Sequence, residues 1–166
     1  FAKSMAGIGA FLAGDKDVIQ FLQYNLRSQM FAKSLPMAMV KGALKRLDMI
    51  RTMPELKEKL WENTRNLQSG LRNAGFDLGT TQTCITPVFL QGDIPEAMAM
   101  VNDLRENHGI FCSIVVYPVI PKGLIILRLI PTATHTQEDI DETITAFSAI
   151  RENLENGTYK KIAAAS

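Results

Sequence analysis

Cysteine is scarce in this sequence, and several strong functional signals are missing with it. Only two cysteines, Cys84 and Cys112, occur among the 166 residues, and their spacing fits neither a disulfide framework nor a metal knuckle. The formal net charge is +1, so the chain lacks the basic field that attracts nucleic acid. No apolar run reaches the roughly 18 to 20 residues that a membrane-spanning helix needs, and no signal peptide is visible. These absences favour a reduced, cytoplasmic protein with no nucleic-acid partner, no membrane span and no metal site.

What the sequence does contain is enough apolar material for a packed core. Hydrophobic residues make up 46% of the chain and charged residues 21%, which suits one or two small globular domains. The first residue is Phe1 rather than methionine, and the opening residues resemble the interior of a domain. We therefore expect the sequence to continue a longer polypeptide.

The first 50 residues are rich in small and apolar side chains. The opening reads FAKSMAGIGAFLAG, and its part from Ile8 to Ala13 predicts a short strand buried on both faces, with glycines that permit close backbone approach. Asp15 is placed to cap a helix that extends to about Met30. Pro36 then opens a second apolar helix over 37–51.

From Pro54 onward, helices alternate with strands, which is typical of an open α/β or α+β layer domain. Leu56, Leu60, Asn63/Thr64, Leu67 and Leu71 mark the buried stripe of the first helix of this region, and Gly75 ends it. The predicted elements are a helix over 54–74, strands within 76–90, a helix over 95–108, strands over 110–117 and 124–130, and a helix over 136–154. We accordingly predict three parts: residues 1–50 from a larger domain, a small α/β domain over 51–155, and a flexible tail over 156–166.

Arg128 stands out because it is the only charge in LIILRLI, a run suited to a buried strand. A buried guanidinium without a partner costs several kcal/mol, so something anionic should meet it. One interpretation is an internal ion pair, and another is an arginine at a strand edge whose head reaches solvent. The functional interpretation is a ligand carboxylate or phosphate bound by the planar fork of donors.

Lys3 lies between small residues and leads directly into a glycine-rich apolar stretch. A lysine sheltered in such a pocket has a lowered pKa and can form a Schiff base, although a lysine on the surface is the commoner case. The tetrapeptide FAKS occurs a second time, at residues 31–34, so local sequence alone does not separate Lys3 from Lys33. The wider context favours Lys3, because only the first copy runs into the glycine-rich stretch.

His135 immediately precedes Thr136, which begins a helix and has Asp139 three residues later as in a capping box. Its simplest role is to shape the start of that helix. His108 precedes Gly109 at the end of another helix, where it complements the helix dipole. We do not assign a catalytic role to either histidine.

Four segments in order resemble the α-oxoamine synthase family of pyridoxal-phosphate-dependent enzymes. They are FAKSMAGIGAFLAG, LWENTRNLQSGLRNAGFDLG, TCITPVFL and YPVIPKGLIILRLIPTATHT, and together the resemblance covers residues 1 to about 154. Each segment is weakly specific by itself, whereas their order is specific. The family includes glycine C-acetyltransferase, serine palmitoyltransferase and 8-amino-7-oxononanoate synthase, and the segments do not separate these branches.

The resemblance implies a fold-type I pyridoxal-phosphate transferase, of which this chain supplies the end of the large domain and the small α+β C-terminal domain. It implies that Lys3 holds pyridoxal 5'-phosphate and acts in catalysis, and that Arg128 receives the carboxylate of the amino-acid substrate. The family usually places Ser or Thr after the second Phe, to bind the cofactor phosphate of the neighbouring subunit. This sequence has Ala32 there, so Lys33 or Ser34 is the candidate replacement.

The implied reaction condenses glycine or serine with an acyl-CoA to give an α-oxoamine and free CoA, in a homodimer. The family's ring-binding groups precede its lysine, so we expect this segment alone to be inactive. Two alternatives stay open at this stage. An ordinary fold-type I aminotransferase would need the same lysine and arginine, and a non-catalytic dimerising subunit or fragment would need neither.

Overall fold

The computed structural model describes residues 1–165, and the chain divides into two compact units, Phe1–Pro54 and the part from Glu55 onward. The division lies a few residues beyond the boundary predicted after residue 50. No helix in the described part is both long and apolar enough to cross a membrane.

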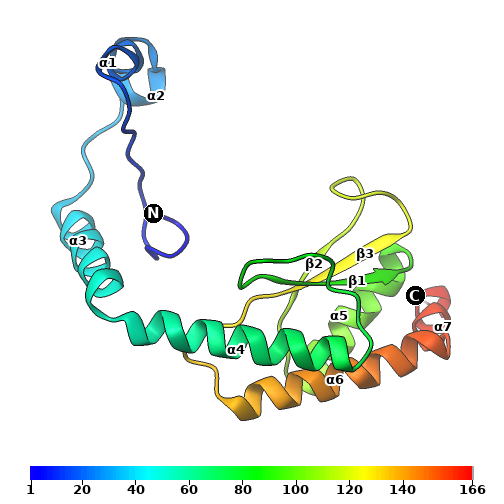
Figure 1. Ribbon diagram of the computed structural model, residues 1–166. Coiled ribbons are helices and arrows are strands. Elements are labelled where there is room, and N and C mark those ends of the chain that lie inside the picture. The colour runs from blue at the N-terminus through cyan, green and yellow to red at the C-terminus, as the bar shows by residue number, and fades with distance from the viewer. Residues whose placement is uncertain (166) are drawn as a thin grey trace. The chain divides into compact units, whose positions relative to one another are not determined.

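The first unit contains three helices and, within residues 1–54, no strand. Helix α1 spans Lys16–Asn25, α2 spans Arg27–Met30 and α3 spans Met37–Thr52 (Figure 1). Pro36 stands at the N-cap of α3, as its fixed backbone angle favours. None of the residues in these helices is buried within this chain.

Two predictions for this unit were wrong. The stretch from Ile8 to Ala13 forms no strand and is mostly exposed, because a strand needs a neighbour to complete its backbone hydrogen bonds and no strand of residues 1–54 provides one. The helix predicted to extend to Met30 is interrupted at Leu26, whose backbone is extended (φ −85°, ψ 104°). Leucine is a good helix former, so nothing in the local sequence marked this break.

The close backbone approach predicted for the glycine-rich opening is present at Gly9. This residue has φ +107°, and a Cβ atom built there would lie 2.5 Å from a terminal methyl carbon of Leu35. The positive φ favours glycine, because a residue with a Cβ atom would be strained there and would push the Leu35 side chain aside. The contact attaches the opening segment to the chain that leads into α3.

The second unit is built on a three-stranded antiparallel sheet. Its order is β1-β3-β2, so the last strand in sequence is the central one. The strands are β1 (Thr86–Gln91), β2 (Ser113–Val115) and β3 (Leu124–Leu129), and the helices are α4 (Pro54–Asn73), α5 (Ile94–His108), α6 (Gln137–Glu155) and α7 (Thr158–Ala165). Figure 1 shows α4 and α6 running side by side, with the sheet beside them.

The core lies on one face of this sheet. Ile125, Leu127 and Leu129 of β3 are buried, whereas the intervening residues are half-buried or exposed. This alternation follows from the two-residue period of a strand, which sends successive side chains to opposite faces. On the other face, the described side chains are half-buried, as at Ile126, or exposed, as at Arg128.

Helices α4 and α6 are joined by packing at small and aromatic residues and by one hydrogen bond. A Cβ atom on Gly70 of α4 would overlap the terminal methyl carbon of Ile144 on α6, so glycine allows these two helices their close approach. Phe76 packs edge-on against Phe147 with ring centroids 5.8 Å apart. Arg151 then donates to the carbonyl oxygen of Ala74 at 2.7 Å and joins the end of α4 to α6.

The flexible tail predicted for residues 156–166 is wrong for the described part of that segment. Residues Thr158–Ala165 form helix α7, and Tyr159 is only 1% exposed. Its hydroxyl donates to a carboxylate oxygen of Asp103 on α5 at 2.5 Å. The buried aromatic ring of Tyr159, with its hydroxyl satisfied, helps to dock this short helix against the core. Ser166 lies outside the described residues.

Candidate functional site

Arg128 lies on the central strand of the sheet, on the face away from the core. Its neighbours in register are Pro87 on β1 and Ser113 on β2. The same face carries Phe89 and Ile126, both half-buried. The buried strand expected here is buried on one face only, because β3 buries alternate residues. The guanidinium stands on a mainly apolar surface.

The side chain of Arg128 has one hydrogen-bond partner in the described structure. Its Nε atom donates to the hydroxyl oxygen of Ser113 at 2.9 Å. None of the ion pairs formed within residues 1–165 involves Arg128. The internal ion pair that sequence left open is thus not found there, and the exposed guanidinium is free to meet an external anion. Sequence reasoning missed Ser113 because the pairing register that places it beside Arg128 is not readable from one strand.

Lys3 lines a hollow of about 710 Å³ in the first unit. The other lining groups are mainly apolar and include Phe11 together with Val40 and Leu47 of α3. A turn directly follows Lys3, and in it the backbone N–H of Ala6 donates to the carbonyl oxygen of Lys3 at 2.8 Å. Lys3 itself is exposed within this chain, so residues 1–54 do not supply the sheltered environment that a Schiff-base lysine needs.

Lys33 and Ser34 lie between α2 and α3 and are exposed. Neither is among the residues that line the hollow beside Lys3. The two copies of FAKS thus have different surroundings, and the assignment of the cofactor to Lys3 stays a prediction. Lys3 belongs to the first unit and Arg128 to the second, and their service to one site stays a prediction.

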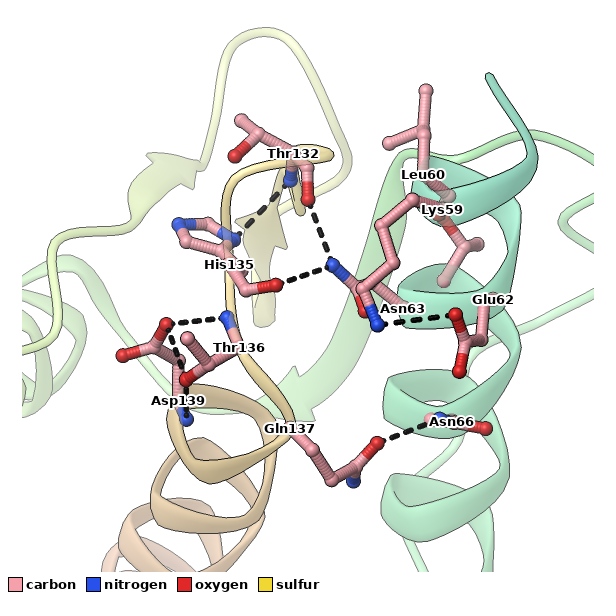
Figure 2. Close-up of polar contacts among 11 residues, drawn as sticks. Lys59, Leu60, Glu62, Asn63, Asn66, Thr132, His135, Thr136, Gln137 and Asp139 are labelled. Carbon is pink, nitrogen blue, oxygen red and sulfur yellow. Dashed lines mark hydrogen bonds and ion pairs between the residues drawn. The ribbon is translucent and has the colours of Figure 1, made fainter. Parts of the chain in front are cut away.

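The loop between β3 and α6 is held by hydrogen bonds, which Figure 2 shows. The side-chain amide nitrogen of Asn63, on α4, donates to the carbonyl oxygens of Thr132 at 2.9 Å and His135 at 2.8 Å. The backbone N–H of Thr132 donates to Nδ1 of His135 at 3.2 Å. His135 thus shapes the approach to α6, which is the simpler of the roles that its sequence position suggested.

Asn63 is polar, yet it is completely buried. Its position agrees with the stripe that the helical period assigns to the core. Its side-chain nitrogen donates to two part-buried loop carbonyls, one of which, that of Thr132, also accepts from the backbone N–H of His135. Its Oδ1 atom has no hydrogen-bond partner among the described residues. Sequence reasoning found the position but not the purpose of this polar residue.

The start of α6 is fixed by the predicted capping box. The backbone N–H of Asp139 donates to the hydroxyl of Thr136 at 3.1 Å, and the backbone N–H of Thr136 donates to the Asp139 carboxylate at 2.7 Å. The backbone N–H and the hydroxyl of Thr136 both donate to the Asp139 carboxylate. These two hydrogen bonds, with a smaller contribution from nearby His135, hold the pKa of Asp139 below its usual value. The carboxylate is therefore used for capping.

Other reactive groups give no sign of a separate site. Both histidines, His108 and His135, border a hollow of about 320 Å³ in the second unit. Within the described residues, however, no group of three or more His, Cys, Asp or Glu side chains is arranged to hold a metal ion. Cys112 is buried, and burial raises the pKa of its thiol to about 11, which disfavours a nucleophilic role.

Comparisons with known proteins place this geometry in context. The family model described as aminotransferase class I and II matches residues 1–147. The chain is 71% identical over 162 residues to a cysteate-C-fatty acyltransferase from Capnocytophaga ochracea, a match that covers 98% of this chain and 39% of that protein. It is 40% identical over 144 residues to a serine palmitoyltransferase from Sphingobacterium spiritivorum, covering 87% of this chain and 36% of the relative.

The fold matches solved structures of similar proteins. A serine palmitoyltransferase solved with a pyridoxal-phosphate internal aldimine superposes with a TM-score of 0.82 at 29% identity, covering 93% of this chain and 39% of that chain. The chain thus spans about two fifths of the length of the relatives that it matches.

Proposed function

Since the chain belongs to the aminotransferase class I and II family, we propose that it acts as part of a pyridoxal-phosphate-dependent C-acyltransferase of the α-oxoamine synthase type. The proposed reaction joins an amino acid to a fatty acyl-CoA and releases free CoA. The observation that carries this proposal is the 71% identity to a cysteate-C-fatty acyltransferase over 98% of this chain.

The same relative suggests which amino acid is used. Sequence reasoning pointed to glycine or serine, and cysteate is a serine whose hydroxyl is replaced by a sulfonate. We propose cysteate as the preferred substrate, with serine as the nearest competitor. All three amino acids share the α-carboxylate that Arg128 is proposed to bind.

The residues of this chain fit pyridoxal phosphate by the chemistry of their donors. Lys3 offers a primary amine at the edge of a hollow, which suits a covalent bond to the cofactor's aldehyde. Lys33 and Ser34 offer a cation and a hydroxyl for the phosphate, in place of the hydrogen bond that Ala32 cannot donate. Because neither of these two residues lines the Lys3 hollow, we propose that they serve the cofactor of a second copy in a homodimer.

In this proposal, Arg128 binds the substrate and Lys3 transfers a proton. Arg128 binds the substrate carboxylate through paired N–H donors and so fixes the orientation of the bonds at Cα. The cofactor, when bound, withdraws electrons from Cα. The Nζ atom of Lys3, once free, carries a proton at Cα. The overall reaction breaks the Cα–H bond and the thioester C–S bond, forms a bond between Cα and the acyl carbon, and leaves the displaced proton on the released thiol.

The unpaired state of both thiols, Cys84 and Cys112, is compatible with the proposed cytoplasmic location. The wider setting of the site, including the groups that contact the cofactor ring, belongs to the full-length protein.

A substrate screen with the full-length protein tests the function. Cysteate, serine and glycine are each combined with acetyl-CoA and palmitoyl-CoA, and thiol release is measured. We expect the highest kcat/KM with cysteate and palmitoyl-CoA, and loss of activity in both Lys3→Ala and Arg128→Ala. Amino transfer to a keto acid with no thiol release would instead identify an aminotransferase.

A further inference from the structure

The hydrogen bond between Arg128 and Ser113 crosses from the central strand to its short neighbour β2. The two residues are paired in register, and Nε of Arg128 donates to Oγ of Ser113 at 2.9 Å. The same hydroxyl lies 3.5 Å from the backbone carbonyl oxygen of Arg128, to which it can donate. Ser113 therefore accepts from the side chain and donates toward the backbone of one residue.

This arrangement uses one particular edge of the guanidinium. An arginine can bind a carboxylate through Nε and one terminal nitrogen, or through its two terminal nitrogens. Because the Nε–H is already donated to Ser113, the edge formed by the two terminal nitrogens is left for a ligand. The partner on the other side, Pro87, has no polar side-chain atom that could compete.

We propose that Ser113 is a positioning residue, which holds Nε of Arg128 so that the terminal edge of the guanidinium is presented to the amino-acid carboxylate. This inference rests on the proposed function and adds to it a residue that sets the affinity for one substrate. A long arginine side chain that is ordered before binding loses less conformational entropy when the substrate arrives. Ser113 is half-buried, which restrains the hydroxyl that does the holding.

The test uses full-length, cofactor-loaded protein and compares Ser113→Ala with Ser113→Thr. Amino-acid affinity is obtained from the change in cofactor absorbance as cysteate or serine is added. Loss of one hydrogen bond that orders a charged group should weaken affinity about 3- to 10-fold in Ser113→Ala. Ser113→Thr keeps the hydroxyl on a residue suited to strands and should stay within about 2-fold of wild type. Ser148→Ala, an exposed serine on α6, is the matched control.

Two further readouts separate positioning from a general structural effect. In Ser113→Ala, KM for the amino acid should rise while KM for the acyl-CoA stays constant. An amino-acid amide, which lacks the carboxylate, should bind wild type and Ser113→Ala equally. Adding Ser113→Ala to Arg128→Ala should cause no further loss, because the serine acts only through the arginine.

The possible failures are distinguishable. If wild-type protein shows neither an amino-acid-dependent absorbance change nor thiol release, the proposed function falls and this inference falls with it. If wild type responds and Arg128→Ala does not, but Ser113→Ala binds like wild type, only the role of Ser113 is wrong. Equal loss of affinity for the amino acid and its amide in Ser113→Ala would also overturn it.

Discussion

At the residue scale, two identical tetrapeptides show that the immediate sequence of a lysine does not determine its surroundings. Lys3 and Lys33 have the same neighbours on either side, yet the hollow that Lys3 lines does not include Lys33. The difference arises from the segment after each copy. The first copy leads into a turn stabilised at the carbonyl of Lys3, whereas the second leads to Pro36 and α3. Reactivity should depend on these surroundings rather than on the tetrapeptide.

The duplicated lysines supply their own control for the covalent link to the cofactor. Borohydride reduction of the full-length protein should trap pyridoxal phosphate on the peptide that contains Lys3. Peptide mass spectrometry should find the added mass there and not on the peptide that contains Lys33. Lys3→Ala should abolish trapping, whereas Lys33→Ala should keep it and only weaken cofactor affinity. Trapping at Lys33 would reverse the assignment.

The two cysteines should differ in their rates of alkylation. Burial raises the pKa of Cys112 to about 11, so at pH 8 only about one thiol in a thousand is the reactive thiolate. Cys84 is half-buried and more accessible. Iodoacetamide at pH 8 should therefore label Cys84 first, and Cys112 should react only after unfolding. Equal labelling of the folded protein would contradict the burial of Cys112.

At the scale of elements, the loop after β3 depends on a single side chain of α4. Replacing Asn63 by leucine keeps the same branched skeleton of side-chain heavy atoms but removes the donors to the carbonyls of Thr132 and His135. We expect a loss of about 2 kcal/mol in the free energy of unfolding, because two part-buried hydrogen bonds between α4 and the loop are removed. Fluorescence of Trp61, the only tryptophan and a residue of the same helix, can follow unfolding in urea.

Asn66 is the control for that experiment. It lies on the same helix and donates only to the side chain of Gln137, near the surface. Figure 2 shows both asparagines. Asn66→Leu should cost no more than about 0.5 kcal/mol. Similar losses in the two variants would show that the loop does not depend on Asn63.

Helix α7 should make the stability of the second unit depend on pH at both extremes. Burial acts to raise the pKa of Asp103, but hydrogen bonds from Asn107, Tyr159 and Asn153 outweigh it and the pKa is lowered below 3.8. Burial, and then the hydrogen bond to Asp103, raise the pKa of Tyr159 above its usual 10.0. The lowered carboxyl pKa stabilises the fold above about pH 3.8 and the raised phenol pKa stabilises it below about pH 10, so both contributions are present in between.

Tyr159→Phe tests this linkage. The variant should lose about 1 kcal/mol near pH 7, because it lacks the hydroxyl that donates to Asp103. The difference from wild type should shrink as the pH falls below about 3.8 or rises above about 10. Urea denaturation across this range provides the measurement. A difference that is constant with pH would mean that the two groups are not coupled.

The elements that depend on interactions within a few residues were predicted from sequence, and those that depend on distant partners were not. Helices α3, α4, α5 and α6 were predicted because prolines, caps and apolar period act within a few residues. The absent strand near Ile8 and the docked helix α7 were not predicted, because each depends on partners far away in the chain. The same holds for the site: Arg128 was visible as a lone charge, whereas Ser113 and Asn63 gain their roles only through pairing across strands and loops.

At the scale of the whole molecule, the two units differ in how much apolar surface they bury. The described core residues all belong to the second unit, which has a sheet, covering helices and capped ends. The first unit carries exposed Phe11, Phe21 and Phe31 together with the lysines that we assign to the cofactor. Arg128 and Lys3 are thus contributed by separate units, and the central claim is that the full-length protein uses them at one site.

An amino-acid titration of the full-length Arg128→Ala variant tests that claim most directly. The cofactor's absorbance is recorded as cysteate is added, with wild type as the reference. Loss of the paired donors should raise the amino-acid concentration needed for half the change by about 10- to 100-fold, while the cofactor itself stays bound through Lys3. An unchanged half-saturating concentration would show that Arg128 does not face the site that Lys3 serves.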